Sequence, residues 1–407
     1  MKRGLLFLLL ILLTLNGLSG QEFSDYYGAA SSWFIDENTG KTVFPLLKLP
    51  LGLRSLSMGT ASTAVAKDGS TILGNPAGTS ILGTSGLLFS HTDGIGDVSI
   101  ESIGYTNRFN NLGIGISGQF MHIDFTARNS WGESTGAALI PEGVITLNAS
   151  YNFLSSYYFR GVTVGGNLKT AFRSVSESLY PGQSLFSVMA DIGVMTQFNF
   201  LKFYDSRDRN FFAGLKVSNL GLAAKGDPLP SEASAGFSYA PIRPLLIAFD
   251  FNLPFALYPD VGEVDSWYLA GGADLQVTDF FSMQTGFNYS GGNPRLSMGS
   301  ELLLSDMSIL VNYTLDLGTQ TDSLDRFSLE ATMNMGDSGR ESFRFEVDQY
   351  FISGLEAYAL GDLETAVKYW QAALNLDPGF QPAQEYMNIA NETLSLYTRM
   401  EEMNRLR

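Results

Sequence analysis

The chain has 407 residues, of which 45% are hydrophobic and 13% aromatic, with 43 glycines, no cysteine and a formal net charge of -16. The absence of cysteine excludes disulfides, thiolate metal sites and a lipid-modified N-terminal cysteine. The excess of acidic residues argues against nucleic acid and anionic lipid headgroups as partners, because both are recognised through basic patches.

Residues 1–20 have the three parts of a secretory signal peptide: a basic start at Lys2 and Arg3, an apolar run at 5–13 and small residues before Gln21. The apolar run is too short to cross a bilayer as a helix. We therefore expect export from the cytoplasm and cleavage near Gln21, with an uncleaved anchor as the alternative. Removal of two basic residues and no acidic ones would take the formal charge from -16 to -18.

Residues 21–85 come before the first convincing strand and alternate poorly between apolar and polar residues. We expect a short helix at about 59–66, a turn at 68–69 and a second short helix that opens at Asn75 and Pro76. Asparagine is a favoured N-cap, and proline at the first helical position lacks only a donor that would be unsatisfied anyway. Taken alone, this tetrapeptide NPAG predicts a helix start or a turn.

From residue 86 to 335 the sequence falls into alternating runs separated by turn residues. Around Asp191, for example, the apolar residues share one parity and the polar residues take the other, so one face of the run is apolar and the other polar. The pattern predicts fourteen strands, at about 87–92, 97–109, 111–126, 143–154, 159–174, 186–202, 210–221, 233–241, 244–252, 266–278, 280–290, 294–304, 306–316 and 325–335.

The connections between these runs alternate between long and short. They are long at 127–142, 175–185, 222–232, 253–265 and 317–324, with exceptions after the first, sixth and eleventh runs. A soluble sandwich also half-buries its strands, but short turns on one side and long loops on the other are typical of an outer-membrane barrel. We therefore predict an all-β transmembrane barrel of about fourteen antiparallel strands, with both of its ends on the periplasmic side.

Three short motifs in the segment before the barrel carry a resemblance to a known family. They are LRSLSMG (53–59), AVAKD (64–68) and GNPAG (74–78), and together they resemble the N-terminal hatch of FadL-type outer-membrane proteins. That group contains transporters of long-chain fatty acids and other hydrophobic compounds, as well as PorV-type relatives. One departure is that Ser57 and Thr60 stand where glycine is common, which bears on the flexibility of the hatch.

The resemblance implies a barrel that is plugged by the hatch, with ligand passing through an apolar interior. It implies that Asn75, Pro76, Ala77 and Gly78 lie in the lumen and take part in ligand binding and gating. Hatch rearrangement or a lateral opening in the wall would release the ligand.

A change of phase in the third run would fit a lateral opening. Its apolar residues are even-numbered up to Phe120 and odd-numbered from Met121 onwards. The pattern predicts a bulge or kink near Gly118, Phe120 and Met121. An ordinary bulge, without any opening, is the alternative.

After residue 335 the pattern becomes helical, beyond a polar linker at 336–347. The stretch 354–378 resembles a tetratricopeptide repeat, and a third helix is expected at about 382–405. The residues at the spacing of the repeat are Gly354, Gly361, Ala366, Trp370, Ala373 and Pro378.

The helical module at 348–407 would hang in the periplasm, where Tyr350, Gly354, Tyr358 and Trp370 are its candidate partner-binding residues. Repeat arrays need three or more units for stability, and the sequence holds one clear unit. A soluble periplasmic protein is one expected partner. The alternative is a helical cap over the barrel mouth that binds nothing.

The sequence offers little for catalysis. Its two histidines, His91 and His122, give a metal site little to build on. Ser90 adjoins His91, but neighbours in a strand point to opposite faces, so this pair cannot form a nucleophile and base. We expect neither an enzyme nor a bound cofactor.

The sequence therefore predicts an outer-membrane channel for long-chain fatty acids or other hydrophobic small molecules, gated by the hatch and surrounded by outer-membrane lipid. A barrel with a tetratricopeptide-like tail resembles a group of spirochaete FadL-like proteins. The alternative function is a PorV-like barrel that does not transport but docks secreted or periplasmic proteins. A lipid-modifying enzyme is a third and weaker hypothesis, because no catalytic constellation is evident.

Overall fold

The computed structural model describes residues 41–93, 98–128, 131–177, 181–204, 206, 208–257, 264–290, 293–317 and 326–405. The predicted signal peptide at 1–20 and the adjoining residues 21–40 lie outside the described part.

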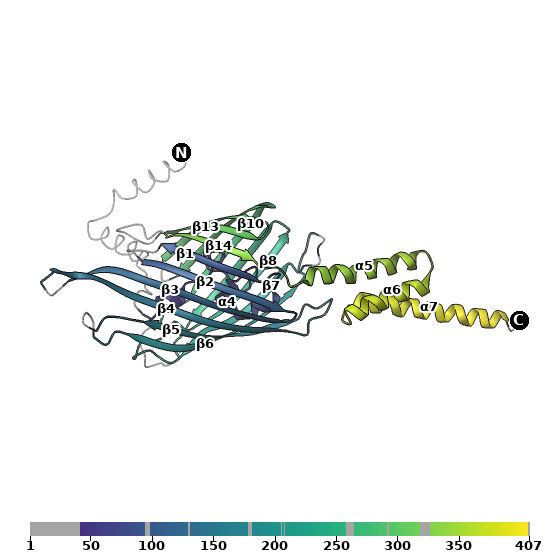
Figure 1. Cartoon of the computed structure of the whole chain (residues 1–407), viewed down its shortest axis with the longest axis horizontal. Coiled ribbons are helices and arrows are strands. Elements are labelled where there is room, and N and C mark those ends of the chain that lie inside the picture. Colours follow the sequence, from purple (N-terminus) through teal and green to yellow (C-terminus); the bar gives the residue numbers. More distant parts are fainter. Residues whose placement is uncertain are drawn as a thin grey trace, which may run out of the picture.

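Fourteen strands form one closed sheet (Figure 1). They are β1 Gly86–Asp93, β2 Val98–Phe109, β3 Leu112–Arg128, β4 Ser134–Phe153, β5 Val162–Arg173, β6 Leu185–Phe198, β7 Phe211–Gly221, β8 Glu232–Ile242, β9 Leu245–Pro254, β10 Tyr268–Thr278, β11 Phe281–Ser290, β12 Asn293–Leu303, β13 Met307–Asp316 and β14 Arg326–Asn334.

Every strand pairs antiparallel with its neighbours in sequence, and β1 closes the sheet by pairing with β14. Closure leaves no unpaired edge, which is what allows a sheet to stand in an apolar medium. Because Gly86 pairs with Asn334, the chain enters and leaves the barrel at the same end, and the helical tail follows there (Figure 1). The prediction of a fourteen-stranded antiparallel barrel is confirmed.

The predicted bounds agree with the strands to within a few residues, except at β4. That strand begins at Ser134 and pairs with β3 as far as Arg128, whereas the sequence analysis assigned 127–142 to a loop. The β3–β4 hairpin consequently extends beyond the other strands at the end away from the tail (Figure 1). Small residues on β4, such as Ala137 and Ala138, and Pro141 hide the alternation there, so that tertiary pairing decides the structure.

The two faces of the wall differ as the alternation predicts. Large apolar side chains such as Phe89, Ile145 and Leu215 are exposed on the outer face. Buried polar side chains such as Asn148, Asp191 and Asn312 point into the lumen, where they meet the segment before the barrel.

Residues 41–85, hereafter the plug, contain four short helical turns: η2 Pro45–Lys48, α3 Leu53–Ser57, α4 Thr71–Gly74 and η3 Pro76–Ile81. The start of η3 at Asn75 and Pro76 is as predicted. The helix predicted at 59–66 is absent, and α3 lies before it instead. Gly59 and Thr60 have positive φ angles of 65° and 72°, a left-handed conformation that ends a right-handed helix.

The tail consists of α5 Arg340–Ala359, α6 Leu363–Leu376 and α7 Gln381–Arg405. The predicted linker at 336–347 is wrong over most of its length, because α5 begins at Arg340. The Asp337 carboxylate accepts hydrogen bonds from the backbone N–H groups of Gly339 and Glu341, which caps the first turn of α5. In the described part of the chain, no helix is both long and apolar enough to cross a membrane.

Candidate functional site

The plug is held in the lumen by side chains of the wall. Among the described residues, backbone-to-backbone hydrogen bonds from 44–84 run only to other residues of the same segment. Several of its other polar backbone groups bond to side chains of the wall. Asp250 accepts from Ser62 N and Thr63 N, both at 2.8 Å, and Glu330 accepts from Leu53 N at 2.7 Å. No strand pairing joins the plug to the barrel, so the plug could move without breaking the hydrogen bonds between the strands of the wall.

The four predicted hatch residues Asn75, Pro76, Ala77 and Gly78 are all buried against the lumen face of the wall. The Asn75 side chain accepts from Ala77 N at 3.1 Å, as an N-cap does. Its amide donates to Thr63 O at 2.8 Å and to wall carbonyls on β6 and β7 at 3.3 Å. This asparagine therefore fixes the start of η3 and also ties it to two strands.

Glycines in the wall make room for the plug. A Cβ atom at Gly165 would lie 2.2 Å from Pro76 O, and one at Gly193 would lie 2.1 Å from Asn75 Oδ1. A Cβ atom at Gly286 would likewise lie 1.9 Å from Gly59 N. These positions require glycine because the plug approaches them closely, through its backbone at Gly165 and Gly286 and through the side chains of Asn75 and Pro76 at Gly193. The sequence alone did not reveal which glycines those were.

A buried ionic cluster joins the plug to the wall. The Arg54 guanidinium bonds to Asp68 in the plug, to Asp274 on β10 and to Glu301 on β12, at 2.6 to 2.7 Å. Lys67 reaches the same Asp274 oxygen at 2.9 Å. Two cations thus face three carboxylates, and Arg54 contacts all three. Arg54 lies within the LRSLSMG motif, but its role cannot be predicted from the sequence because its partners Asp274 and Glu301 lie far along the chain.

Ser57 and Thr60, where the FadL-type pattern commonly has glycine, also bind the wall. Ser57 Oγ donates to Asn312 Oδ1 at 2.9 Å, and Thr60 Oγ1 accepts from Asn288 Nδ2 at 2.9 Å. The two departures from the family pattern therefore add hydrogen bonds between plug and barrel.

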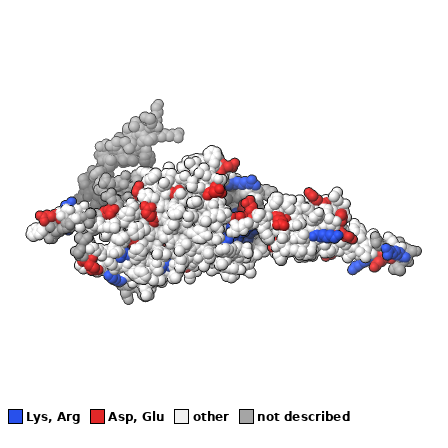
Figure 2. Space-filling view, viewed as in Figure 1, with Lys and Arg blue, Asp and Glu red and all other residues white. Residues whose placement is uncertain are grey.

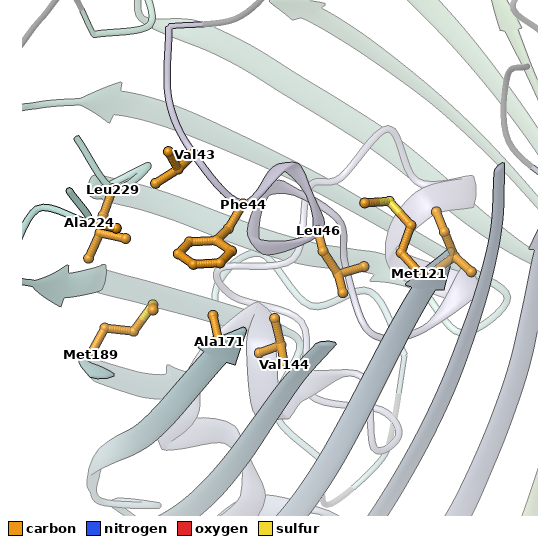
Figure 3. Packing of buried hydrophobic residues seen from close by; sticks show 10 residues of the cluster. Val43, Phe44, Leu46, Met121, Val144, Ala171, Met189, Ala224 and Leu229 are labelled. Atoms are coloured by element: carbon orange, nitrogen blue, oxygen red, sulfur yellow. The ribbon is translucent and has the colours of Figure 1, made fainter. Parts of the chain in front are cut away.

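An apolar contact anchors the start of the plug (Figure 3). Val43, Phe44 and Leu46 pack against a row of inward-facing wall residues from β3 to β6, which includes Met121 and Val144. Met121 is 5% exposed. Odd-numbered β3 residues such as Met121 are apolar because they face this part of the plug.

The kink predicted near Gly118, Phe120 and Met121 is wrong. Pairing of β3 with β2 runs without a shift from Leu112 to Ile123, and pairing with β4 is equally continuous up to Ala127. The apparent change of phase came from an apolar lining of the lumen and not from a bulge. The wall is therefore closed on both sides of β3 in this structure.

Gly118 and Phe120 lie instead on the outer face of the barrel. They line an outward-facing apolar groove of about 620 Å³ that spans β14, β1 and β2 to β5. Large side chains such as Phe89 and Phe172 border the groove, and Gly118, which has no side chain, forms part of its floor.

The plug separates two cavities of about 180 Å³ each. The one away from the tail is lined by polar wall residues such as Lys169 and Glu232, and the one at the tail end includes Arg209 and Arg243. The apolar interior implied by the resemblance is not found. Small apolar clusters around Phe44, Met58, Leu51 and Leu53 join the plug to the wall, and between them the wall presents mainly polar side chains, many of which bond to the plug.

The predicted partner-binding residues of the tail form its core. Trp370 is fully buried, and its ring covers Gly354, where a Cβ atom would lie 2.3 Å from Nε1. Tyr350 and Tyr358 are half-buried against the same cluster. Trp370 and Gly354 are thus inaccessible to a partner, and large and small residues at these positions allow α5 and α6 to pack closely.

Within the described residues no group of three or more His, Asp or Glu side chains is placed to hold a metal ion. His91 bonds to Glu101 and Asp93 on the outer face of the barrel, at 2.6 and 3.1 Å, and no serine contacts it among the bonds described. The site that remains is the interface between plug and wall.

The family model of UPF0164, an uncharacterised protein family, matches residues 27–337, which span the plug and the whole barrel. The chain belongs to the UPF0164 family. A UPF0164 protein of Treponema pallidum (strain Nichols) is 27% identical over 387 residues, covering 92% of this chain and 88% of that protein. Another from the same organism is 32% identical over 178 residues, covering 43% and 53%.

Among solved structures, the CymD monoaromatic hydrocarbon channel is similar to this UPF0164 chain with a TM-score of 0.51 at 11% identity. The likeness covers 72% of this chain and 99% of CymD. The Pseudomonas putida toluene transporter TodX is similar at a TM-score of 0.45 and 10% identity, covering 68% and 95%. At such low identity the likeness to CymD supports the barrel fold alone.

Proposed function

We propose that this UPF0164 protein is an outer-membrane barrel that admits long-chain fatty acids or other hydrophobic small molecules, with the plug as its gate. The observation that carries the proposal is the mode of attachment of the plug. It fills the lumen of a closed barrel, yet side chains and not strand pairing hold it. CymD and TodX, which are described as a hydrocarbon channel and a toluene transporter, add support by analogy of fold.

Passage requires the plug to rearrange. Each cavity of about 180 Å³ is smaller than the roughly 300–1,000 Å³ typical of ligand pockets. In the resting arrangement the hatch residues Asn75, Pro76, Ala77 and Gly78 block the space between β3 and β7. Movement of η3 away from β5 and β6 would join the two cavities.

The apolar outer face implies a membrane around the barrel, because charged side chains there would cost about 2–4 kcal/mol each at the bilayer midplane. We place the short turns and the tail in the periplasm and the β3–β4 hairpin outside the cell. The outward groove at Gly118 and Phe120 would be filled by lipid or by a departing hydrophobic molecule.

A reversible disulfide between η3 and the wall, hereafter the lock, tests whether the plug must move during transport. The chain has no cysteine, so Thr79→Cys with Ser150→Cys would introduce one disulfide between η3 and β4, where the two hydroxyls lie 2.6 Å apart. The matched control is Ser297→Cys with Thr314→Cys, which joins β12 to β13 at 2.9 Å and leaves the plug free. Uptake of radiolabelled oleate and toluene would be measured in proteoliposomes, oxidised and reduced.

The expected result is saturable uptake by the unmodified protein, lost on oxidation of the Thr79–Ser150 pair alone and restored by reduction. Absence of saturable uptake by the unmodified protein would contradict the channel. Uptake that persists with the lock closed would contradict only the gating role of η3.

A second candidate, a PorV-like docking protein, is favoured by one observation. The C-terminal half of α7 exposes an apolar stripe that no described residue covers: Ile389, Leu396, Met400 and Met403 are 48–60% exposed. A barrel with a full lumen and an exposed helix face suits the docking of periplasmic or secreted proteins. In-cell cross-linking from residues 389–403, with and without Leu396→Glu and Met400→Glu, tests this. A stoichiometric partner that the glutamates abolish would support docking, and none would count against it.

A further inference from the structure

Arginines gather where the barrel meets the tail, and Figure 2 shows basic side chains at this junction. Arg108 lies at the tail end of β2, Arg160 and Arg209 lie in the two long tail-end connections, and Arg340 and Arg344 lie in the first turns of α5. The chain has 25 basic residues against 41 acidic ones. These five arginines are hereafter called the junction cluster, and Figure 2 shows acidic side chains beside the basic ones there.

The hydrogen bonds described for three of these guanidinium groups go to backbone carbonyls. Carbonyl oxygens carry no net charge, so such bonds orient a guanidinium group without neutralising it. The bonds are Arg340 to Arg108 O and Gly83 O (both 2.7 Å), Arg108 to Leu82 O (3.0 Å) and Asn110 O (2.7 Å), and Arg209 to Tyr157 O (3.1 Å) and Tyr158 O (2.9 Å).

The members of the cluster repel one another. Arg344 is close enough to act electrostatically on Arg108, Arg160 and Arg340. Burial lowers the pKa of Arg160, and Arg344 and Arg209 lower it further.

Two carboxylates oppose this repulsion. Asp208 lies near Arg160, and Asp337 lies near Arg340. The five arginines outnumber these two carboxylates, and Glu341 and Asp348 lie on α5 on either side of Arg344. An additional anion would relieve the repulsion.

We propose that the junction cluster binds a phosphate group between the barrel and the tail. The planar fork of guanidinium donors matches the oxygens of phosphate, and several arginines around one point can share its charge. Arg344 is exposed and the other four are half-buried, so a ligand can reach the cluster from water. The phosphate could belong to a free phosphorylated molecule or to a phospholipid headgroup at the membrane surface.

Phosphate binding is proposed separately from transport, although Arg108 and Arg340 bond to Leu82 O and Gly83 O at the end of the plug and Arg209 lines the tail-end cavity. The net negative charge of the chain argued against anionic partners. That argument used the average charge of the whole chain, whereas folding brings arginines from positions 108 to 344 together, so an anion could bind at this place.

The first test uses the full-length protein refolded in a neutral detergent, with Tm measured against inorganic phosphate and against chloride at equal ionic strength. We expect a saturable rise with phosphate alone. Arg344→Gln should weaken phosphate affinity about tenfold, since one charge-assisted contact is lost. Arg344→Lys, which keeps the charge, should restore part of it. The matched control is Arg399→Gln, which removes an exposed arginine from α7.

The second test identifies the source of the phosphate. Lipid discs of phosphatidylcholine, with and without phosphatidylglycerol, would hold the same variants. If phosphatidylglycerol raises Tm and abolishes the response to free phosphate, in the unmodified protein and in Arg399→Gln but not in Arg344→Gln, the ligand is a headgroup. A response to free phosphate that persists in both discs indicates a soluble ligand. The proposal is overturned if neither phosphate nor phosphatidylglycerol acts beyond its control, or if Arg399→Gln weakens binding as much as Arg344→Gln.

Discussion

Arg54 and Glu301 lie 247 positions apart in the chain, yet Nη2 of Arg54 donates to both carboxylate oxygens of Glu301, at 2.7 and 2.6 Å. The same guanidinium reaches Asp274 at 2.6 Å and Asp68 at 2.7 Å. One plug side chain therefore connects α3 to β10 and β12. The contact is buried, so its loss would leave carboxylates without their main partner.

Arg54→Met should lower the free energy of unfolding by about 3–5 kcal/mol, because removal of the guanidinium leaves the buried carboxylates without their main cationic partner. The measurement is unfolding by guanidinium chloride of the protein refolded in detergent. Arg128→Gln is the control: this arginine is exposed and donates to Gly132 O alone among the bonds described, so its change should stay within about 0.5 kcal/mol.

The addition of Asp274→Asn and Glu301→Gln to Arg54→Met should recover part of the lost stability, since the two unpaired buried carboxylates are then replaced by neutral amides. Equal stability of Arg54→Met and Arg128→Gln would show that the cluster does not hold the plug.

The sequence predicted the barrel well because alternation is a local property, and each strand carries its own evidence. It failed where long-range contacts decide. Met121 faces inward because it packs in one cluster with Phe44 and Leu46, 77 and 75 positions earlier, and this apolar packing produced the sequence pattern of a bulge. Gly59 and Thr60 have a left-handed backbone, which prevents the helix predicted at 59–66. The role of Arg54 in joining the plug to the wall became evident only from the structure, in which Glu301 lies beside it.

Gly165→Ala should displace η3 from the wall. The added Cβ would lie 2.2 Å from Pro76 O, and such overpacking costs about 1–3 kcal/mol. We expect faster proteolysis within residues 70–82 and a lower Tm.

Gly118→Ala is the matched control for this substitution. It sits on the outer face of β3, where the new atom meets Ile103 at an ordinary 3.6 Å. The control also tests the continuity of β3, because a hinge glycine would not tolerate alanine. Similar proteolysis of the two variants would contradict the close packing of η3 on β5.

Trp370→Ala should destabilise the tail by about 3–5 kcal/mol, as expected for the loss of a fully buried Trp side chain. The barrel should be unaffected, because its strands pair only with one another. Circular dichroism at 222 nm would follow the helices, and the heat-induced shift in electrophoretic mobility would follow the barrel. Tyr369→Ala, at the more exposed neighbouring position, is the control. Loss of both signals together would mean that the barrel depends on the tail.

The tail rests on the barrel through the loop between β4 and β5. Tyr157 meets Phe380 edge to face, with ring centroids 5.2 Å apart, and Tyr158 Oη donates to Glu385 at 2.9 Å. Such an aromatic pair contributes about 0.5–1.5 kcal/mol beyond the area it buries. Tyr157→Ala combined with Tyr158→Phe should therefore let the tail swing relative to the barrel.

Spin labels at Ser155→Cys and Ser395→Cys would report this motion as a broader distribution of distances in a chain that has no other cysteine. Phe159→Ala, in the same loop, is the control and should keep the distribution narrow. If the double variant also keeps it narrow, the two tyrosine side chains do not hold the tail, and the bonds of Arg340 to Arg108 O and Gly83 O and of Tyr158 N to Gln381 Oε1 would have to fix it. Arg340→Gln in that background would then broaden the distribution, since it removes two of the remaining described bonds between barrel and tail.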